Sequence, residues 1–357
     1  MSLPHSTRRR NWGMLALAAA VTVPLVCAAA CGSPSSAATA ATPLRLYAYP
    51  ASTLFAAAAL LKINGHKKEA AELKAIARTP SGVWATGQPG EMQQVRQVTQ
   101  AATQTHAIPV IVAYNLPARD ACGKFSAASG PTAVQYKNWV GQLAAAIGTG
   151  DDIVIVEPDG LPDIVRGCLS EAQGSQRYQL LRYAMQHLAA LPHTLVYLDA
   201  GNPSTFGDPA QLAGPLGRAG LRYGRGFSAN VANFQWTATV VAWSQQLERA
   251  LGGSARAVID TSRNGRGPYT GPDAPRWCNP PGRALGPAPR LDPGPAGIDA
   301  YLWIKDPGSS DGPCNGGPAA GLYWPQYALA LAESRAADAA AGRGRSRLWR
   351  QPSGGQL

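Results

Sequence analysis

Short apolar runs alternate along the chain with longer segments in which apolar residues recur at helical spacing. Residues 153–156, Ile-Val-Ile-Val, form the clearest run, and its unbroken apolar character predicts a strand that is buried on both faces. Similar runs predict strands at residues 83–84, 108–114, 194–198, 226–230, 256–260 and 298–304. The spacing between these runs predicts helices at residues 52–77, 91–105, 132–147, 171–190, 209–218, 237–251 and 325–336.

This alternation indicates an α/β fold in which parallel strands are joined by right-handed crossovers. Seven strands suit a distorted parallel barrel, similar to a TIM barrel, at least as well as an open doubly wound sheet. No glycine-rich fingerprint opens the first helix, which disfavours a dinucleotide-binding fold. We therefore expect a distorted seven-stranded parallel α/β barrel and no cofactor.

The two ends of the chain differ from this pattern. Arg8, Arg9 and Arg10 precede an apolar segment and a run of small residues, so residues 1–31 are expected to form a signal peptide or a lipoprotein leader. Two alternatives remain open, lipidation of Cys31 or cleavage at an Ala-x-Ala site. Residues 32–43 are expected to be a linker, residues 44–335 the catalytic domain and residues 336–357 a disordered tail.

The cysteine count agrees with export. Outside the leader the chain has four cysteines, Cys122, Cys168, Cys278 and Cys314, which is an even number and predicts two disulfides. Spacing alone does not choose among the three connectivities. Because no Cys-x-x-Cys pattern is present, we expect no zinc site and no other metal.

The formal net charge of +11 is partly carried by the leader and the tail. The remaining basic residues are scattered and are not interleaved with aromatic residues, so we expect no nucleic-acid partner. A weak attraction to acidic cell-envelope polymers is compatible with this charge. We expect a monomer.

Polar residues collect just after the predicted strands, where the loops of a parallel sheet converge. They are Asn115, Asp120, Glu157, Asp159, Asp199, Asn230, Asn233, Asp260, Arg263, Lys305 and Asp311. Any one of them fits a helix cap or a turn, but the whole set favours a site. Carboxylates from separate loops suit general acid catalysis on a glycosidic bond.

Two other chemistries have little support. The histidines, at positions 5, 66, 106, 187 and 193, lie away from the strand ends, which disfavours a histidine-based triad. Residues 308–312 match the Gly-x-Ser-x-Gly pattern, but no helix is predicted directly after them, so we treat this match as chance.

Aromatic residues lie near the same strand ends and offer flat faces for sugar rings. They are Trp84, Tyr114, Trp236, Trp277 and Trp303, of which Trp303 lies within a strand and is the best candidate for a core residue.

Seven segments resemble glycoside hydrolase family 6, the inverting cellulases that include endoglucanases and cellobiohydrolases. They are YNLPARDACG from Tyr114, IVIVEPDGLP from Ile153, VYLDAG from Val196, GFSANVANFQWT from Gly226, AVIDTSRNGRGP from Ala257, WCNPPGRALG from Trp277 and DAYLWIKDPGSSDG from Asp299. They follow the order of the family across about residues 44–332. The resemblance implies a distorted parallel barrel and a β-glucan or cellulose substrate.

The resemblance also implies roles for five carboxylates. Asp159 corresponds to the general acid of the Glu-Pro-Asp motif, and Glu157 to its structural carboxylate. Asp120 corresponds to the aspartate that raises the pKa of the acid and organises the attacking water. Asp311 corresponds to an aspartate proposed as the base or as a stabiliser of the charged transition state. Asp199 corresponds to a substrate-binding aspartate.

Further positions follow by the same resemblance. Trp84, Trp277, Arg283 and Lys305 fall on sugar-contacting positions, and the disulfides implied are Cys122 with Cys168 and Cys278 with Cys314. Tyr114 and Trp236 are added as candidate sugar contacts because of their places at strand ends.

The chain departs from the family pattern at three places. Asn202, a candidate substrate contact, stands where a histidine is frequent, and residues 203–206 lack the sugar-stacking tryptophan that is common there. Ser309 replaces a glutamate, and Ala121 is inserted between Asp120 and Cys122. These changes predict altered affinity or glycan preference more than lost chemistry.

We therefore expect an exported endo-β-1,4-glucanase that inverts the anomeric configuration. The short span between Arg283 and Asp299 leaves little chain to roof a tunnel, which favours an open cleft. The alternatives are a cellobiohydrolase, or an envelope glycan-binding protein on the same fold with weak or no turnover.

Overall fold

A computed structural model describes residues 45–50, 53–126, 130–272 and 275–340. All of the described residues belong to one compact unit. The expected leader with Cys31, the linker at residues 32–43 and the tail from residue 341 lie outside the described residues, so they stay predictions. In the part of the chain that the structure describes, no helix has both the length and the apolar character needed to cross a membrane.

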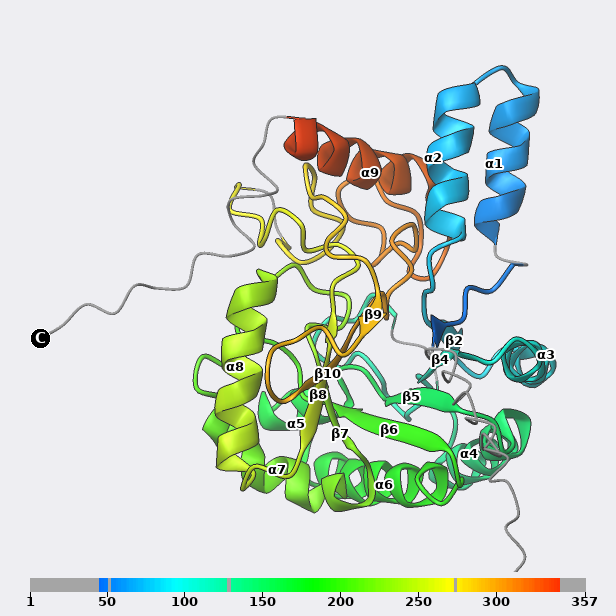
Figure 1. The fold of residues 1–357 in the computed structure, drawn as a ribbon. Coiled ribbons are helices and arrows are strands. Elements are labelled where there is room, and N and C mark those ends of the chain that lie inside the picture. The colour runs from blue at the N-terminus through cyan, green and yellow to red at the C-terminus, as the bar shows by residue number, and fades with distance from the viewer. Residues whose placement is uncertain (1–44, 51–52, 127–129, 273–274, 341–357) are drawn as a thin grey trace, which may run out of the picture. The chain divides into compact units, whose positions relative to one another are not determined.

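The main sheet has eight strands, of which the first seven in its order are parallel neighbours (Figure 1). In spatial order they are β2 (Val83–Ala85), β4 (Val110–Ala113), β5 (Asp152–Val156), β6 (Thr194–Asp199), β7 (Gly226–Ala229), β8 (Arg256–Asp260), β10 (Ile298–Leu302) and β9 (Arg290–Leu291). The predicted α/β architecture is confirmed, but the predicted strand number is too low by one. The extra strand is β9, which pairs antiparallel with β10 and has only two residues.

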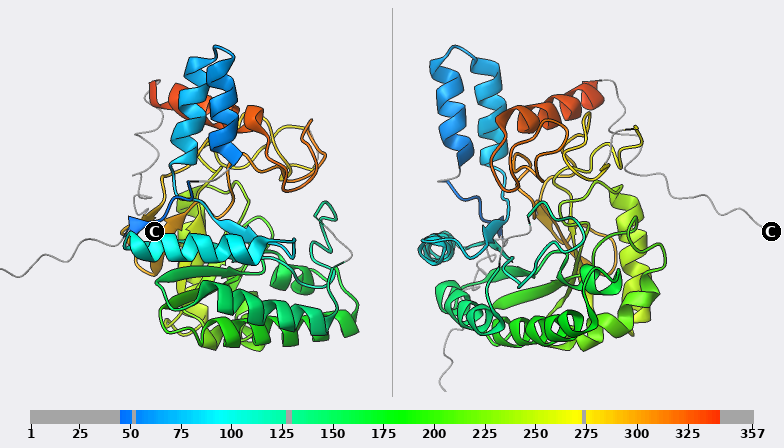
Figure 2. Two further views of the ribbon diagram at one scale, coloured as in Figure 1. Left: turned by 90° about the vertical axis from the view of Figure 1, so that its right-hand side faces the viewer. Right: turned by 180° about the vertical axis from the view of Figure 1, so that it is seen from behind.

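The sheet curls until its first strand approaches the end of β10 (Figures 1 and 2). The N–H of Gly82 donates to the carbonyl of Trp303 at 2.8 Å, and Nε1 of Trp84 donates to the carbonyl of Ile304 at 2.9 Å. A Cβ at position 82 would lie 2.4 Å from that Ile304 carbonyl oxygen, so this approach requires glycine. The barrel is therefore distorted, since isolated hydrogen bonds replace a full strand pairing here.

The strand predicted at residues 108–114 is divided in two. The first part, β3 (Ala107–Ile108), pairs with β1 (Arg45–Leu46) in a separate two-stranded sheet, and the second part, β4, belongs to the main sheet. Pro109 lies between them, and proline has no N–H to donate to a ladder.

Most helices cover the outside of the sheet, whereas three others pack together at one end of the barrel (Figure 2). The outer helices are α3 (Glu91–Gln104), α4 (Ala133–Ile147), α5 (Gly160–Val165), α6 (Glu171–Leu188), the 3₁₀ helix η1 (Pro209–Leu212), α7 (Ala213–Arg218), the 3₁₀ helix η2 (Leu221–Tyr223) and α8 (Thr237–Ala250). The other three are α1 (Thr53–Ile63), α2 (Lys67–Ala77) and α9 (Pro325–Ala340), which share an apolar cluster of their own. Capping boxes start α4 at Thr132 and α6 at Ser170, which explains why both starts were predictable.

Two helical predictions need correction. The single helical region at residues 52–77 is a pair of helices, because Gly65, at φ 85°, turns the chain between them. The tail was predicted to be disordered from residue 336, but α9 continues to Ala340. Asp338 on that last stretch forms an ion pair with Arg266, with Nε and Oδ2 2.7 Å apart.

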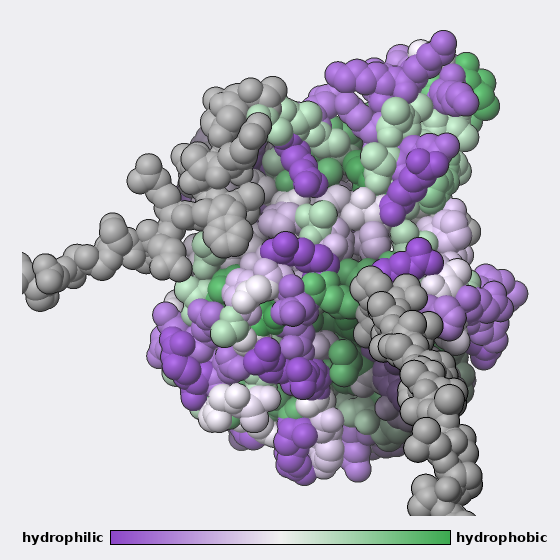
Figure 3. Space-filling model, in the orientation of Figure 1, coloured by the Kyte–Doolittle hydropathy of each residue, from purple (hydrophilic) through white to green (hydrophobic). Residues whose placement is uncertain are grey.

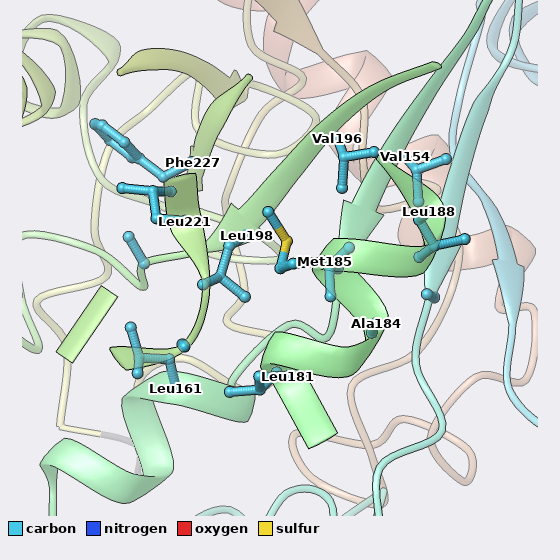
Figure 4. Packing of buried hydrophobic residues seen from close by; sticks show 14 of the residues in the cluster. Val154, Leu161, Leu181, Ala184, Met185, Leu188, Val196, Leu198, Leu221 and Phe227 are labelled. Atoms are coloured by element: carbon cyan, nitrogen blue, oxygen red, sulfur yellow. The ribbon is translucent and has the colours of Figure 1, made fainter. Parts of the chain in front are cut away.

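Apolar side chains of one strand fill two cores. Ile153 and Ile155 of β5 point into the barrel, whereas Val154 and Val156 pack outward against the helices. Figure 4 shows the outer core, where Val154 and Val196 face Met185 and Leu188 of α6. This double burial explains the unbroken apolar run. On the face shown in Figure 3, hydrophilic side chains cover much of the surface at the lower edge, where the outer helices lie.

Candidate active site

The carboxyl ends of the parallel strands lie at one edge of the sheet, and the polar residues predicted after them gather there. The turn after β5 carries two of them, Glu157 and Asp159, both in the left-handed region, with φ values of 51° and 64°. Backbone strain of this kind costs free energy and is common at functional sites. Hydrogen bonds to the Glu157 carboxylate and from the Asp159 main chain hold this turn in place.

Glu157 is fully buried and holds neighbouring segments together. Its carboxylate accepts hydrogen bonds from the N–H groups of Asn115 and Leu116 and from the hydroxyl of Tyr136 at 2.9 Å. Burial raises the pKa of Glu157 to about 7, although these hydrogen bonds act in the opposite direction. Because this carboxylate is enclosed and fully engaged, it ties the end of β4 to the end of β5 and does not reach a substrate.

Asp159 presents a carboxylate that is accessible to solvent and accepts no hydrogen bond from any described residue. Protein nevertheless surrounds the group on its other sides. This desolvation, followed by the negative charges of Asp199, Asp163 and Asp120, raises the pKa of Asp159 well above its usual range. The group is thus reachable from outside and keeps its proton to a higher pH than an ordinary aspartic acid.

Asp199 lies behind Asp159. It is only 1% exposed, and its Oδ2 accepts a 3.0 Å hydrogen bond from the main-chain N–H of Asp159. Its Oδ1 accepts a 3.1 Å hydrogen bond from the hydroxyl of Ser228. Burial raises the pKa of Asp199 to about 6. The predicted substrate-binding aspartate therefore contacts the backbone of the candidate acid rather than facing solvent.

Asp120 lies in a tight loop after β4, at φ 53°. Its Oδ2 accepts hydrogen bonds from the N–H of Ser126 at 2.6 Å and from the hydroxyl of Ser126 at 2.9 Å. That hydroxyl also contacts the hydroxyl of Tyr114 at 2.8 Å. A Cβ at Gly123 would lie 2.1 Å from Oδ1 of Asp120, so only glycine allows the loop to fold this closely around the carboxylate.

The loop of Asp120 is anchored to the segment that follows Asp159. The disulfide Cys122–Cys168 joins them, as the resemblance implied, and the N–H of the inserted Ala121 donates to Oδ2 of Asp163 at 2.7 Å. The insertion is thus accommodated by a hydrogen bond to α5. Arg177 adds a third link, because its guanidinium donates to the carbonyls of residues 117 and 118.

Asp163 and Arg177 were missed as site residues. Arg177 is only 3% exposed and lies on the inward stripe of α6, three residues after Gly174 and four before Leu181. An arginine on an apolar helical stripe was the available signal.

Asp311 is held by two buried cations. Nη1 and Nη2 of Arg263 donate to its two oxygens at 2.8 and 3.0 Å, and Nζ of Lys305 lies 3.4 Å from Oδ1. Burial alone would raise the pKa of Asp311, but the charges of Arg263 and then Lys305 outweigh it and bring the pKa below its usual range. Asp311 is therefore an ionised carboxylate whose oxygens are already engaged.

Asn279 fixes the loop that carries Asp311. Its N–H donates to Oδ2 of Asp311 at 3.0 Å, and its Oδ1 accepts from the N–H of Asp311 at 2.8 Å. The disulfide Cys278–Cys314 closes the same loop, again as the resemblance implied. The Ser310 hydroxyl donates to the carbonyl of Pro318 at 2.8 Å, so it serves the loop, in agreement with treating the Gly-x-Ser-x-Gly match as chance.

Aromatic rings lie near the segments that carry these carboxylates. Trp84 and Tyr114 meet edge to face, with ring centres 5.3 Å apart, and Nζ of Lys305 lies 5.5 Å from the Trp84 ring centre. Trp277 is 39% exposed and lies 5.5 Å from the ring of Phe125, which belongs to the Asp120 loop. Trp303, in contrast, is buried, as expected for a core residue.

The other predicted sugar contacts hold loop segments together. Oδ1 of Asn202 accepts hydrogen bonds from the Ser204 hydroxyl at 2.6 Å and from main-chain N–H groups of the same turn. Nη1 of Arg283 donates to three carbonyls at residues 266–268, of which Gly267 is the nearest at 2.8 Å. Trp236 lies against Gly267. Nothing in the described part of the chain joins Asn202 or Arg283 directly to the three catalytic candidates.

The described residues contain one group with the spacing of a metal site, namely Cys122, Asp163 and Cys168. Its two sulfurs form a disulfide and are not thiolate ligands, so this group does not fit a metal ion.

The comparisons with known proteins agree with this geometry. A family model described as Glycosyl hydrolases family 6 matches residues 42–335. Endoglucanase 1 of Streptomyces sp. (strain KSM-9) is 39% identical over 262 residues, which cover 72% of this chain and 70% of that protein. Endoglucanase A of Cellulomonas fimi is 39% identical over 267 residues, which cover 73% of this chain but only 56% of that protein.

One solved structure is also similar to this chain in sequence and in fold. The endoglucanase Cel6 from Mycobacterium tuberculosis, in complex with methyl-cellobiosyl-4-deoxy-4-thio-β-D-cellobioside, is 38% identical with a TM-score of 0.74. The match covers 82% of this chain and 97% of that chain.

Proposed function

Because the chain belongs to glycoside hydrolase family 6, we propose that it is an exported endo-β-1,4-glucanase in which Asp159 protonates the leaving sugar. The family inverts the anomeric configuration. The observation that carries the assignment of the acid is the raised pKa of the solvent-accessible Asp159 carboxyl at the end of β5. The two disulfides support a protein that folds in an oxidising compartment.

A general acid must hold a proton at the pH of catalysis and must be accessible to the glycosidic oxygen. Asp159 meets both needs, because neighbouring carboxylates and desolvation favour its protonated form while one side remains open. The hydrogen bond from its main chain to Asp199 fixes the position of the turn without consuming the carboxyl group. The main chain of Asp159 thus fixes the position of the residue, and its side-chain carboxyl remains free to donate a proton.

Asp120 and Asp311 take different supporting roles. Asp120, clamped by Ser126, adds negative charge near the acid, and we assign it the orientation of a water molecule. An inverting mechanism needs room for that water, with the two carboxyl groups roughly 6.5–9.5 Å apart. Asp311 is engaged by Arg263 and Lys305, which makes it a weak proton acceptor. We assign it the stabilisation of positive charge that develops on the sugar ring.

The substrate proposed is a β-1,4-glucan. Trp84 and the exposed Trp277 offer aromatic surfaces for the apolar faces of glucose rings, and Lys305 beside Trp84 offers a hydrogen-bond donor. The thio-linked cello-oligosaccharide bound by the M. tuberculosis relative supports this substrate class.

The names of the bacterial relatives favour internal cleavage over release from chain ends and favour an enzyme over a glycan-binding protein. A monomeric state remains a prediction.

The proposal is tested on the mature chain with barley β-glucan and carboxymethylcellulose, by following new reducing ends. We expect release by the wild type and at least a 100-fold smaller rate for Asp159→Asn. Asp292→Asn, in the turn after β9, is the matched control and should keep wild-type activity. No release by the wild type over a wide pH range would contradict the enzyme, and early β-anomeric products would contradict inversion.

A further inference from the structure

A polar hollow lies on the outside of the molecule, away from the strand-end site. It has a volume of about 360 Å³ and is lined by side chains of α4, α6 and the end of α7. Figure 1 shows α4 and α6 side by side at the lower edge of the barrel. No residue of the candidate active site lines this hollow. Its volume is within the range of small-ligand sites, about 300–1,000 Å³.

Three cations line the hollow, Lys137, Arg182 and Arg218. Among the described residues, no aspartate or glutamate lines it, and none of the three cations forms an ion pair with a described carboxylate. Three like charges without a counter-charge give the hollow a positive potential. Such a hollow favours an anionic ligand.

The cations are held in place by their neighbours. Nε and Nη2 of Arg182 donate to the main-chain carbonyl of Arg218 at 3.1 and 2.7 Å. The guanidinium of Arg218 lies 4.0 Å from the ring centre of Tyr178. Nζ of Lys137 lies 5.3 Å from the ring centre of Tyr183. The positive charges are therefore positioned before any ligand arrives, which reduces the entropic cost of binding.

The tyrosine faces are already occupied. Arg218 covers Tyr178, and Tyr183 packs against both Lys137 and His187, whose ring centre is 3.7 Å from that of Tyr183. A nucleic-acid base would need an open aromatic face for stacking. A base therefore does not match this lining.

The remaining lining side chains are neutral hydrogen-bonding groups. Ser175, Gln179 and Gln186 supply hydroxyl and amide groups between the cations. A guanidinium binds a carboxylate through two parallel hydrogen bonds, and amide groups bind sugar hydroxyls. We propose that this hollow binds acidic sugar units, such as uronates, of a polysaccharide that the strand-end site does not cleave. The site would hold the enzyme on an acidic polymer while its active site works on a neutral glucan.

The test is calorimetric titration of the mature chain with trigalacturonate at low ionic strength. The double variant Lys137→Gln/Arg182→Gln is expected to bind at least 10-fold more weakly. The double variant Lys62→Gln/Lys67→Gln removes the same charge from α1 and α2, at the opposite end of the molecule in Figure 1, and should bind like the wild type. Hydrolysis of neutral barley β-glucan should be equal in all three proteins.

Three results would overturn the proposal. The first is no binding of trigalacturonate by the wild type. The second is an equal loss in the control variant, which would indicate attraction to net charge alone. The third is displacement of trigalacturonate by an equal concentration of inorganic phosphate, which would indicate a general anion site. Failure of neutral galactotriose to bind would support the need for carboxylates.

Discussion

The main-chain N–H of Asp159 donates a 3.0 Å hydrogen bond to Oδ2 of Asp199, a residue at the end of the neighbouring strand. This contact holds the turn after β5 in its left-handed conformation, at φ 64°, and leaves the Asp159 carboxyl free. It also places a negative charge behind that carboxyl. Asp199 thus acts as a positioning residue whose influence on the reaction passes through Asp159.

Replacing Asp199 by asparagine should lower the pKa of Asp159. The neutral side chain keeps the shape and one acceptor oxygen but removes the charge, which is the strongest effect on this pKa after desolvation. A general acid is active while protonated, so activity falls as pH rises through its pKa. We expect the basic limb of the kcat/KM profile to move to lower pH by about one unit.

Ser228→Ala is the control, because it removes a hydrogen bond to Asp199 but keeps the charge. If Asp199→Asn lowers kcat/KM equally at every pH and moves neither limb of the pH profile, the role of Asp199 is structural only.

Removing the charge of Asp311 should destabilise the fold. Asp311→Asn leaves Arg263, which is fully buried, and Lys305 without a carboxylate partner. We expect a loss of about 3 kcal/mol in the free energy of unfolding at pH 7, measured by urea denaturation. Because the pKa of Asp311 is lowered in the folded state, its contribution is present above the unfolded pKa of about 3.9.

The contribution is lost as pH falls through the folded value. The difference between wild type and Asp311→Asn should therefore shrink in strongly acidic solution. A constant difference from pH 7 down to pH 2 would contradict this account of the ion pair.

Asp152 lies at the start of β5, at the opposite end of the strand from Asp159. It is 2% exposed, and neither oxygen has a hydrogen-bond partner among the described residues. Burial, followed by the charge of Asp151, raises its pKa to about 7. The folded state keeps this proton up to about pH 7, whereas an unfolded aspartic acid loses it near pH 4. Ionising Asp152 therefore destabilises the fold as pH rises from about 4 to 7.

Asp152→Asn should remove this destabilisation. We expect a gain of about 2 kcal/mol in the free energy of unfolding at pH 8 and little change at pH 4. The exposed neighbour Asp151→Asn is the control and should change stability by much less at either pH. Equal gains for Asp152→Asn at both values of pH would show that the effect is unrelated to ionisation.

The sequence was sufficient to predict those elements that have a local pattern of apolar residues or a local motif. The apolar run of β5 marks a strand buried on both faces, and the motif around Asp159 marks its carboxyl end. Strand β9 was missed because two residues carry no periodic pattern. Helix α5 was missed because Gly160 and Pro162, both poor helix formers, lie in its six residues.

Long-range partners could not be predicted from the sequence. Asp199 was recognised as a site residue, but its contact with the Asp159 backbone depends on how two neighbouring strands end. Asn279 was not identified as a site residue, because asparagine occurs mostly at surfaces, and only the fold shows that it is buried. Local patterns thus indicate where a carboxylate lies, and the tertiary structure decides what it contacts.

The central claim is that Asp159 donates a proton to the leaving glucosyl oxygen. The most direct measurement compares Asp159→Ala with the wild type on two substrates, barley β-glucan and an aryl β-cellotrioside with a dinitrophenyl leaving group. The aryl group leaves without protonation, so the variant should lose about 10²–10⁴-fold in kcat on β-glucan but less than about 10-fold on the aryl substrate. An equal loss on both substrates would contradict the assignment of Asp159 as the general acid.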